Sequence, residues 1–243
     1  MGISWLKTGW LLATAIAFFS VLFLNFPEID LWASGLFFND GFTLRKNEVF
    51  RFIRYVYIDG LTIFALLCLI MLIRATLIGK RRAIPLNVWG FMVATFLTGP
   101  ILMTNGIFKA YWGRARPANV EFFGGDLMFS PPLLISDQCD SNCSFVSGEG
   151  SAIATFVIVF AIVFWPNLKG IWRNITLYFA LPLSIFAICL RILTGRHFLS
   201  DTLFAILFCA AVAWGFYRLF NMRDHRHAAT WTNLRKDLSK QRS

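Results

Sequence analysis

The stretch Arg191-Ile-Leu-Thr-Gly-Arg-His-Phe-Leu-Ser-Asp201 lies between two long apolar runs and contains the only histidine outside the C-terminal tail. Its Thr-Gly pair predicts a turn between two helices, so the Arg191 guanidinium can fold back over His197. If the second helix begins at Phe198, the Cβ atoms of His197 and Asp201 lie about 5–6 Å apart on one face. A carboxylate there can accept the imidazole N–H and leave the other nitrogen free as a nucleophile. The stretch predicts chemistry on an anionic group, and the alternative is an interfacial histidine beside a snorkelling arginine.

Apolar residues dominate the chain and require a lipid phase. Of 243 residues, 57% are hydrophobic, whereas soluble domains are about 45–50% apolar. A helix needs about 20 residues to cross the hydrocarbon core, and six runs meet or approach that length, near residues 9–26, 57–75, 87–108, 151–167, 175–193 and 200–220. The first run resembles a signal peptide, but no small-x-small cleavage pattern follows it, so we expect a retained helix. We therefore expect an all-α fold, a polytopic membrane protein with six transmembrane helices in one bundle, with residues 1–243 forming a single domain.

Charged residues divide unevenly between the two ends of this bundle. The segments on one side hold 14 of the 23 Lys and Arg, and the other side holds nine, together with 11 of the 13 acidic residues. By the positive-inside rule, both termini are cytoplasmic and the Arg191–Asp201 turn faces the periplasm from a bacterial inner membrane. Residues 221–243 form a basic cytoplasmic tail that can bind anionic headgroups. This topology accounts for most of the net charge of +10, so nucleic-acid binding is not needed to explain it.

The first outward loop, expected at residues 27–56, contains two segments suited to the membrane surface. Residues 31–38 are apolar and aromatic but too short to span, so we expect them in the interface. Residues 50–55 interleave aromatic and basic side chains. They can draw an anionic headgroup toward the site, or form a snorkelling belt at a helix start. In the third run, Gly99-Pro100 predicts a kink that could open the bundle sideways to lipid.

The end of the third run is basic. Lys109-Ala-Tyr-Trp-Gly-Arg-Ala-Arg116-Pro117 places three cations at an outward helix end, against the positive-inside bias. Lys109 and Arg116 are about two helical turns apart, near one face of a helix that Pro117 would end. Arginine offers a planar fork and lysine a point charge to phosphate oxygens, and interfacial snorkelling is the alternative. Arg114 lies off this face and is predicted to be a bystander. The loop at residues 118–144 is expected to cap the site.

Ser147-Gly148-Glu149 opens the fourth run and predicts an anion site at a helix start. The N–H groups and dipole of a helix N-terminus favour a bound anion. A plain N-cap explains Ser147 and Glu149 equally well. In the preceding loop, Cys139 and Cys143 can form a disulfide in an oxidising compartment, whereas a zinc site there would lack further ligands.

The chain resembles the type 2 phosphatidic acid phosphatase superfamily in three motifs: Lys109-x6-Arg116-Pro117, Ser147-Gly148 and Arg191-x5-His197-x3-Asp201. These are integral-membrane lipid phosphatases that share their pocket with vanadium haloperoxidases. The motifs occur in order within residues 109–201, and the six-helix layout extends the resemblance over nearly the whole chain. The family's second motif usually reads Pro-Ser-Gly-His, where this chain has Val146 and Glu149. Leu190 replaces the serine that commonly precedes the third-motif arginine.

The resemblance implies that His197 attacks phosphorus to form a phosphohistidine and that Asp201 orients it. The groups implied to hold the phosphoryl oxygens are Lys109, Arg116, Ser147, the Gly148 N–H and Arg191. The family's second-motif histidine assists proton transfer at the leaving oxygen, and Glu149 would have to take that role. A glutamate is a poor acid at neutral pH unless burial and the phosphate dianion outweigh nearby cations. As a base in the second step, an ionised glutamate is suitable.

The resemblance thus implies a hydrolase that removes a phosphate from a membrane lipid at the periplasmic face, with no metal or other cofactor. Within the family the candidate substrates are lipid A phosphates, phosphatidylglycerol phosphate and undecaprenyl pyrophosphate, and the Ser-Gly-Glu variant and compact size favour lipid A. The alternatives are a lipid phosphotransferase and a non-catalytic lipid-phosphate binder. The expected partners are the lipid bilayer and the lipid substrate, with no obligate protein partner evident.

Overall fold

The computed structural model describes residues 5–239, which form helices and turns with no β-strand. Six helical segments are long and apolar enough to cross a membrane: Leu6–Asn25, Glu48–Leu77, Leu86–Tyr111, Gly148–Asn167, Ile171–Leu193 and Leu199–Leu219. This confirms the prediction of an all-α protein with six spans. The cytoplasmic placement of the termini stays a prediction, and Lys240 and Arg242 of the predicted tail lie outside the described residues.

The helices follow one another in a fixed order, of which η3 and η7 are π-helical and the other η elements are short 3-10 turns. They are α1 (Trp5–Asn25), α2 (Glu28–Gly35), η1 (Thr43–Lys46), α3 (Glu48–Leu77), η2 (Gly79–Arg81), α4 (Leu86–Phe96), η3 (Leu97–Phe108), α5 (Lys109–Tyr111), η4 (Pro117–Asn119), η5 (Glu121–Phe123), α6 (Gly148–Val163), η6 (Trp165–Asn167), α7 (Ile171–Ile175), η7 (Thr176–Ala180), α8 (Leu181–Leu193), α9 (Leu199–Leu219), α10 (Met222–His225), η8 (Arg226–Ala228) and α11 (Trp231–Ser239).

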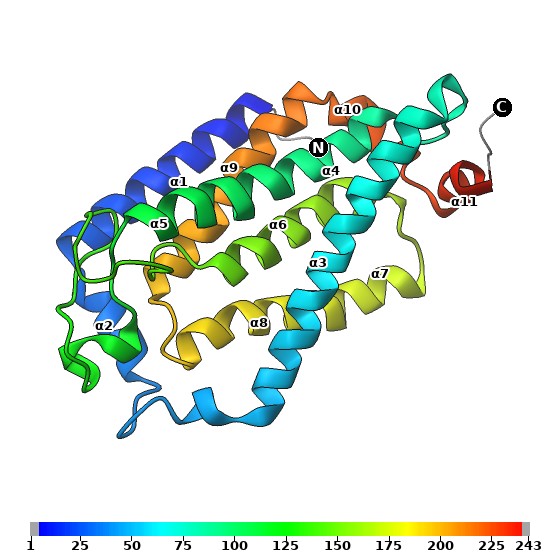
Figure 1. Cartoon of the computed structure of the whole chain (residues 1–243). Coiled ribbons are helices and arrows are strands. Elements are labelled where there is room, and N and C mark those ends of the chain that lie inside the picture. The colour runs from blue at the N-terminus through cyan, green and yellow to red at the C-terminus, as the bar shows by residue number, and fades with distance from the viewer. Residues whose placement is uncertain (1–4, 240–243) are drawn as a thin grey trace.

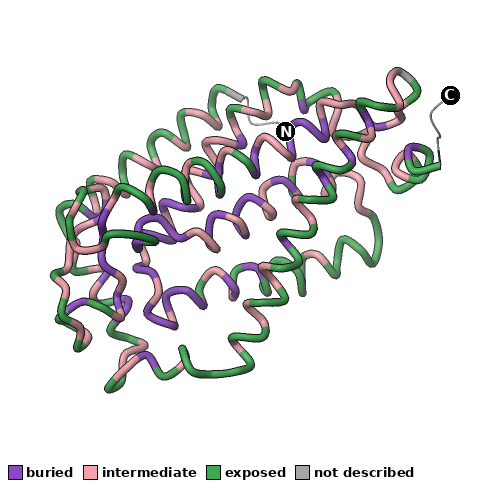
Figure 2. Tube along the Cα trace, viewed as in Figure 1, coloured by how far each residue is buried: buried purple, intermediate pink, exposed green. Residues whose placement is uncertain are grey.

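The bundle is built around α6 and α9, which pack against each other (Figure 1). Helix α4 contacts both of them, α1 covers α9, and α3 and α8 pack against α6. Buried residues follow the inner helices and exposed residues the outer ones (Figure 2). Many of the exposed residues are large and apolar. An apolar outer surface is what a helix bundle presents to lipid chains.

Helix α3 is longer than the apolar run predicted. It begins at Glu48, nine residues before the expected start at residue 57, because the Asn47 side chain accepts hydrogen bonds from the N–H groups of Val49 and Phe50 at 3.0 and 3.2 Å. The expected loop at residues 27–56 is therefore partly helical. At 30 residues, α3 is about 45 Å long and exceeds the roughly 30 Å hydrocarbon core. The helix is therefore longer than one crossing of that core requires.

The third span is distorted at the predicted place. Helix α4 passes into π-helical η3, which contains Gly99 and Pro100, and proline removes a backbone donor from the helix. A Cβ at Gly99 would lie 3.3 Å from Cys209 Sγ and 3.4 Å from Thr155 Oγ1, so glycine allows this close approach to α6 and α9. The helix ends at Tyr111, before the expected stop at Pro117. The residues that follow reach the site from a loop.

Candidate active site

His197 lies in the turn between α8 and α9 and is almost fully buried. The N–H groups of Arg196 and His197 both donate to the Arg191 carbonyl, at 3.0 and 3.1 Å, which closes the turn. Gly195 has a φ of +63°, and a Cβ there would collide with the Phe42 ring at 2.3 Å. The predicted Thr-Gly turn is therefore confirmed, and it returns Arg191 toward the histidine.

The tautomer of His197 is fixed by a backbone carbonyl. Nδ1 lies 2.8 Å from the Ser144 carbonyl oxygen, and because a carbonyl only accepts, Nδ1 carries the proton. Asp201 Oδ2 is 3.8 Å from Nδ1, too far for a direct hydrogen bond. Asp201 instead accepts from the Ser144 hydroxyl at 2.5 Å and so holds the residue that orients the ring. Because the proton is on Nδ1, Nε2 keeps a free lone pair.

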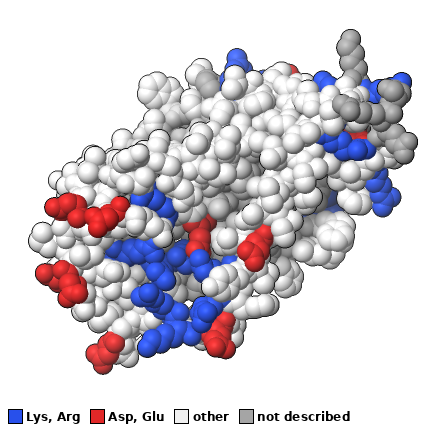
Figure 3. Space-filling view, viewed as in Figure 1, with Lys and Arg blue, Asp and Glu red and all other residues white. Residues whose placement is uncertain are grey.

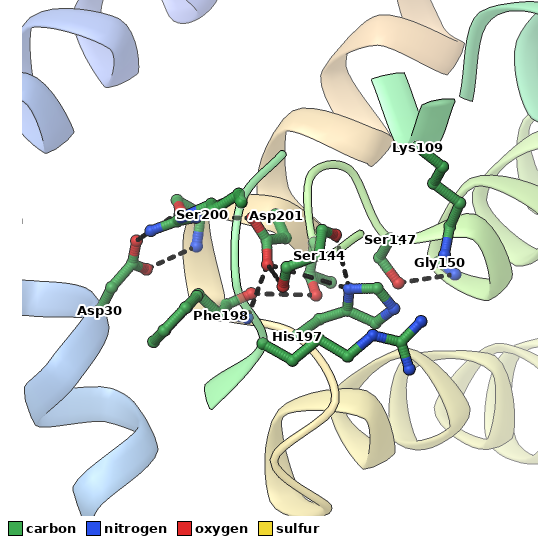
Figure 4. A network of polar contacts seen from close by, with 12 residues as sticks. Asp30, Lys109, Ser144, Ser147, Gly150, His197, Phe198, Ser200 and Asp201 are labelled. Atoms are coloured by element: carbon green, nitrogen blue, oxygen red, sulfur yellow. Dashed lines mark hydrogen bonds and ion pairs between the residues drawn. The ribbon is translucent and has the colours of Figure 1, made fainter. Parts of the chain in front are cut away.

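Arg114 corrects the sequence prediction, which made it a bystander. Its side chain is fully buried and bridges Asp201 at 2.6 Å and Asp30 at 2.8 Å. Asp30 also accepts from the Ser200 N–H at 2.8 Å and from the Ser200 hydroxyl. Burial, together with the nearby charge of Asp201, raises the pKa of the Asp30 carboxyl, against the lowering effect of Arg114. Figure 4 shows this network on the side of His197 away from Lys109. It anchors α2 to the start of α9.

Lys109 and Arg116 converge, although not along one helix face as predicted, because the helix ends at Tyr111. Lys109 Nζ lies 3.0 Å from Asn142 Oδ1, and Arg116 donates to the Asn142 carbonyl at 2.6 Å. Asn142 lies within the Cys139–Cys143 disulfide, whose Cα atoms are 5.7 Å apart. The loop at residues 118–144 therefore contributes directly to the site, as expected.

The start of α6 lies beside Lys109. Ser147 caps the helix, with its side-chain oxygen accepting from the Gly150 N–H at 3.1 Å. A Cβ at Gly148 would lie 2.9 Å from Lys109 Cε, so a larger residue here would displace the end of the lysine side chain. The first N–H groups of a helix have no partner within it, which leaves donors for an oxyanion at this point.

Glu149 is held by two guanidinium groups. Arg54, from α3, donates through Nε at 2.9 and 3.0 Å to the two carboxylate oxygens, and through a terminal nitrogen at 2.7 Å. Arg191 approaches at 3.2 Å. Because arginine only donates, both oxygens of Glu149 act as acceptors in this arrangement. The contacts fit a base or a positioning carboxylate and give no support to a resident proton donor.

Arg191 keeps one hydrogen-bonding position open. It is 7% exposed, and its Nε is a buried donor with no hydrogen-bond partner among the described residues. Leaving such a donor without a partner is costly. A phosphoryl oxygen in the pocket would supply the missing acceptor.

The buried His197 side chain lies near the cationic side chains of Arg191 and Lys109. Burial lowers the pKa of its imidazole to about 4, and Arg191 and Lys109 act in the same direction, while Asp201 opposes them. The ring is therefore neutral at pH 7, the state that a nucleophile requires.

A cavity of about 1350 Å³ joins these groups to the membrane-spanning region. At one end it is lined by His197, Lys109, Arg116, Glu149 and Arg191. It continues between α3 and the α4–η3 helix, where the lining is apolar, with Ile58, Leu61, Leu66, Leu69, Phe96, Leu97 and Ile101. Figure 3 shows Lys and Arg side chains gathered over the hollowed end of the molecule, with an acidic side chain among them. A molecule with an anionic head and apolar chains fits this shape.

Sequence reasoning missed Asp30, Asn142 and the carbonyl of Ser144 as parts of this site, and it included Arg54 only in a segment, residues 50–55, that can draw a headgroup or form a snorkelling belt. Arg54 and Glu149 are 95 residues apart, and no local pattern links them. Asp30 lies just after the first apolar run, and an acidic residue at that position indicates only where the chain leaves the membrane. A backbone carbonyl leaves no trace in a residue pattern.

Comparison with known proteins gives consistent matches. A family model described as the PAP2 superfamily matches residues 87–225. A lipid A 4′-phosphatase of Francisella tularensis subsp. novicida (strain U112) is 31% identical over 214 residues, covering 86% of this chain and 94% of the relative. A lipid A 4′-phosphatase of Rhizobium leguminosarum is 28% identical over 227 residues, covering 84% and 93%. That of Rhizobium etli (strain ATCC 51251 / DSM 11541 / JCM 21823 / NBRC 15573 / CFN 42) is 30% identical over 204 residues, covering 74% of each chain. No solved structure matches the chain.

Proposed function

The chain belongs to the PAP2 superfamily, and we propose that it removes the 4′-phosphate of lipid A through a phosphohistidine at His197. It is a phosphoric monoester hydrolase of this membrane family. The position of the phosphate follows the names of its relatives, which are lipid A 4′-phosphatases. The observation that carries the proposal is the cavity in which a neutral histidine and three cations meet an apolar groove.

In the first step, Nε2 of His197 attacks phosphorus. The new N–P bond forms as the bond from phosphorus to the lipid oxygen breaks, and the electron pair of the broken bond stays on that oxygen. Lys109, Arg116 and Arg191 surround the transferring group and stabilise its oxygens, which is most of what a loose phosphoryl-transfer transition state requires. The ring gains positive charge, and the Ser144 carbonyl and Asp201 lie on the Nδ1 side to stabilise it.

Proton transfer completes the reaction. The lipid oxygen takes a proton from water, because Glu149 is engaged as an acceptor by Arg54 and Arg191. A second water then attacks the phosphohistidine, the N–P bond breaks and inorganic phosphate leaves. Glu149 is the acidic side chain that lines the cavity and serves as the base for this water. The electron pair of the broken N–P bond returns to Nε2, and the proton that Glu149 has taken neutralises the hydroxide left by the first water, so the two steps together consume one water.

We place the protein in the bacterial inner membrane with the site facing the periplasm. By sequence, the segments predicted to lie on the side of the site carry nine of the 23 Lys and Arg, and the segments predicted to lie on the opposite side carry 14. The bilayer is part of the functional environment, since the apolar end of the cavity lies within the spans.

Phosphate release by the purified protein in detergent tests the proposal. Diphosphoryl lipid A, phosphatidylglycerol phosphate and undecaprenyl pyrophosphate would be supplied with and without chelator, with the lipid product identified by mass spectrometry. We expect release from the 4′ position of lipid A in both conditions. His197→Ala should lower the rate by on the order of 10³-fold or more, whereas the matched variant His225→Ala, in the C-terminal segment, should not.

Other outcomes would select the alternatives. Phosphate release only after an acceptor lipid is added would identify a phosphotransferase. Lipid A binding without turnover, unchanged in His197→Ala, would identify a non-catalytic binder. Faster release from either of the other two lipids would overturn lipid A as the substrate.

A further inference from the structure

The cavity carries far more positive charge than one phosphoryl group needs. Its lining contains eight cationic side chains and a single acid, Glu149, a formal balance of +7. The eight are Arg45, Lys46, Arg51, Arg54, Lys109, Arg116, Arg191 and Arg196. A phosphate monoester carries about two negative charges at neutral pH. Of the nine Lys and Arg predicted to face outward, Arg114 is the one that is absent from this lining.

The eight cations fall into two groups by their partners. Four of them already have roles: Arg54 and Arg191 bind Glu149, and Lys109 and Arg116 contact Asn142. No ion pair or side-chain hydrogen bond to the part of the chain that the structure describes involves the second group, which we call the outer cations: Arg45, Lys46, Arg51 and Arg196. They come from η1, the first turn of α3 and the turn before His197.

All four outer cations line the same cavity as the phosphoryl pocket, and Arg45 interacts with both Arg196 and Arg116. Burial lowers the pKa of Arg196, and repulsion by Arg45 and Arg116 lowers it further. The pKa of Arg116 is also lowered by burial and by Arg45, against the pull of Glu149. Arg45 thus acts on a phosphate-binding residue and on the outer group together. Cations held close without a counter-ion are stabilised when an anion enters between them.

We propose that Arg45, Lys46, Arg51 and Arg196 form a second anion subsite, which binds an anionic group of the lipid headgroup other than the phosphate that His197 receives. The ligand class is a phosphate or carboxylate on the same sugar headgroup. The inference rests on the proposed function, because it assumes that the first phosphate lies at His197. The outer cations select lipids with two anionic groups and fix which group reaches the histidine.

Steady-state kinetics with matched lipids test this subsite. The substrates are diphosphoryl lipid A and 4′-monophosphoryl lipid A, in neutral detergent. We expect the wild type to have a KM at least about tenfold lower for the diphosphoryl lipid. In the triple variant Arg45→Gln/Lys46→Gln/Arg51→Gln, the ratio of the two KM values should fall to about one.

The matched control removes the same charge from the other end of the bundle. Lys169→Gln/Arg223→Gln/Lys236→Gln should keep the wild-type ratio. An equal KM for the two lipids in the wild type, or an unchanged ratio in the triple variant, would overturn the proposal. Repeating the assay with phosphatidylglycerol in the micelles separates the two sources of an anion. If the triple variant differed from wild type in KM only when phosphatidylglycerol is present, and by the same factor for both substrates, the outer cations would be assigned to bilayer lipid instead.

Failure of the proposed function would look different. In that case the wild type would release no phosphate from either lipid. Calorimetric binding of the two lipids to His197→Ala would then still measure the second subsite. A tighter diphosphoryl complex, weakened about tenfold by the outer triple substitution, would support the subsite independently of catalysis, and equal affinities would refute it.

Discussion

The chemistry of the site depends on which nitrogen of His197 is free. The Ser144 carbonyl takes the Nδ1 proton at 2.8 Å, and burial together with Arg191 and Lys109 keeps the ring neutral. In the proposed mechanism, Arg191 and Lys109 therefore bind phosphate and also keep the nucleophile neutral. Once a phosphoryl dianion enters, its charge offsets theirs, and the developing imidazolium is stabilised in the second half of the step.

The neutral ring has a measurable effect on stability. The pKa of His197 is about 4 in the folded protein, against 6.5 for an unperturbed histidine. Between these values the unfolded chain binds more protons, so the free energy of unfolding falls as the pH falls from 6.5 to 4. We expect wild type to lose roughly 3 kcal/mol relative to His197→Gln over this window, seen as a steeper fall of Tm in detergent. Parallel Tm profiles would contradict a neutral buried His197.

Glu149 gives a second prediction at the scale of a residue. Because both of its oxygens accept from arginine, we expect it to act on water and on the arginines, and not as the acid for the leaving oxygen. Glu149→Gln should then lower kcat by on the order of 10²-fold, equally for lipid A and for p-nitrophenyl phosphate, whose leaving group needs no acid.

The matched control for this prediction is Glu121→Gln, an exposed acid near the same end of the bundle, which should leave kcat unchanged. A loss confined to lipid A would show that Glu149 does protonate the leaving oxygen. Nearly full activity of Glu149→Gln on both substrates would remove it from the mechanism altogether.

At the scale of elements, helix ends decide which charges meet. Because the third span ends at Tyr111, the residues after it form a loop, and Arg114 turns inward to Asp30 and Asp201 while Arg116 reaches Asn142. The sequence analysis assumed that this stretch is helical. It therefore predicted correctly that Lys109 and Arg116 lie close together, although they do not share a helix face, and it wrongly made Arg114 a bystander. The early start of α3 likewise brings Arg54 to Glu149.

Helix α2 is tied to the catalytic turn by one buried carboxylate. Asp30→Asn would remove a charge that faces Arg114 and Ser200, both buried, and breaking a buried ion pair costs about 3–5 kcal/mol. We expect a clear drop in Tm and a lower kcat per folded molecule, with KM nearly unchanged, because Asp201 and His197 lose their support while the phosphate-binding cations do not. The measurement is Tm together with steady-state kinetics in detergent.

The matched variant is Glu28→Gln, an exposed acid on the same helix. It should change neither Tm nor kcat. Should Asp30→Asn lower Tm and leave the kcat of the folded fraction intact, the network would be structural only, with no part in positioning the histidine.

At the scale of the whole molecule, the residue pattern predicted much but not all. Apolar run lengths gave the six spans within a few residues at most ends. Of the motif residues, Lys109, Arg116, Gly148, Arg191 and His197 line one cavity, whereas Ser147 and Asp201 are fully buried beside it. Apolar composition indicates burial in lipid but does not show where a helix continues beyond its apolar run. The predicted span therefore begins nine residues after the actual start of α3 at Glu48. Contacts between distant segments, such as that of Arg54 with Glu149, depend on the three-dimensional packing.

The same packing separates an apolar exterior, along the spans, from a cationic cavity at one end of the bundle. The spans form an apolar exterior, and eight Lys and Arg side chains line one cavity, over whose end Figure 3 shows such side chains gathered. An anionic lipid can therefore keep its chains in the membrane while its headgroup reaches His197. The proposed mechanism requires this arrangement to form one covalent intermediate, a phosphohistidine at His197.

Rapid-quench trapping with lipid A labelled with ³²P in its 4′-phosphate tests that step most directly. We expect a burst of label on the protein that is stable in alkali and labile in acid, as a phosphohistidine is. It should be present in His225→Ala and absent in His197→Ala. Turnover without labelled protein at any quench time, or label that survives in His197→Ala, would contradict the account.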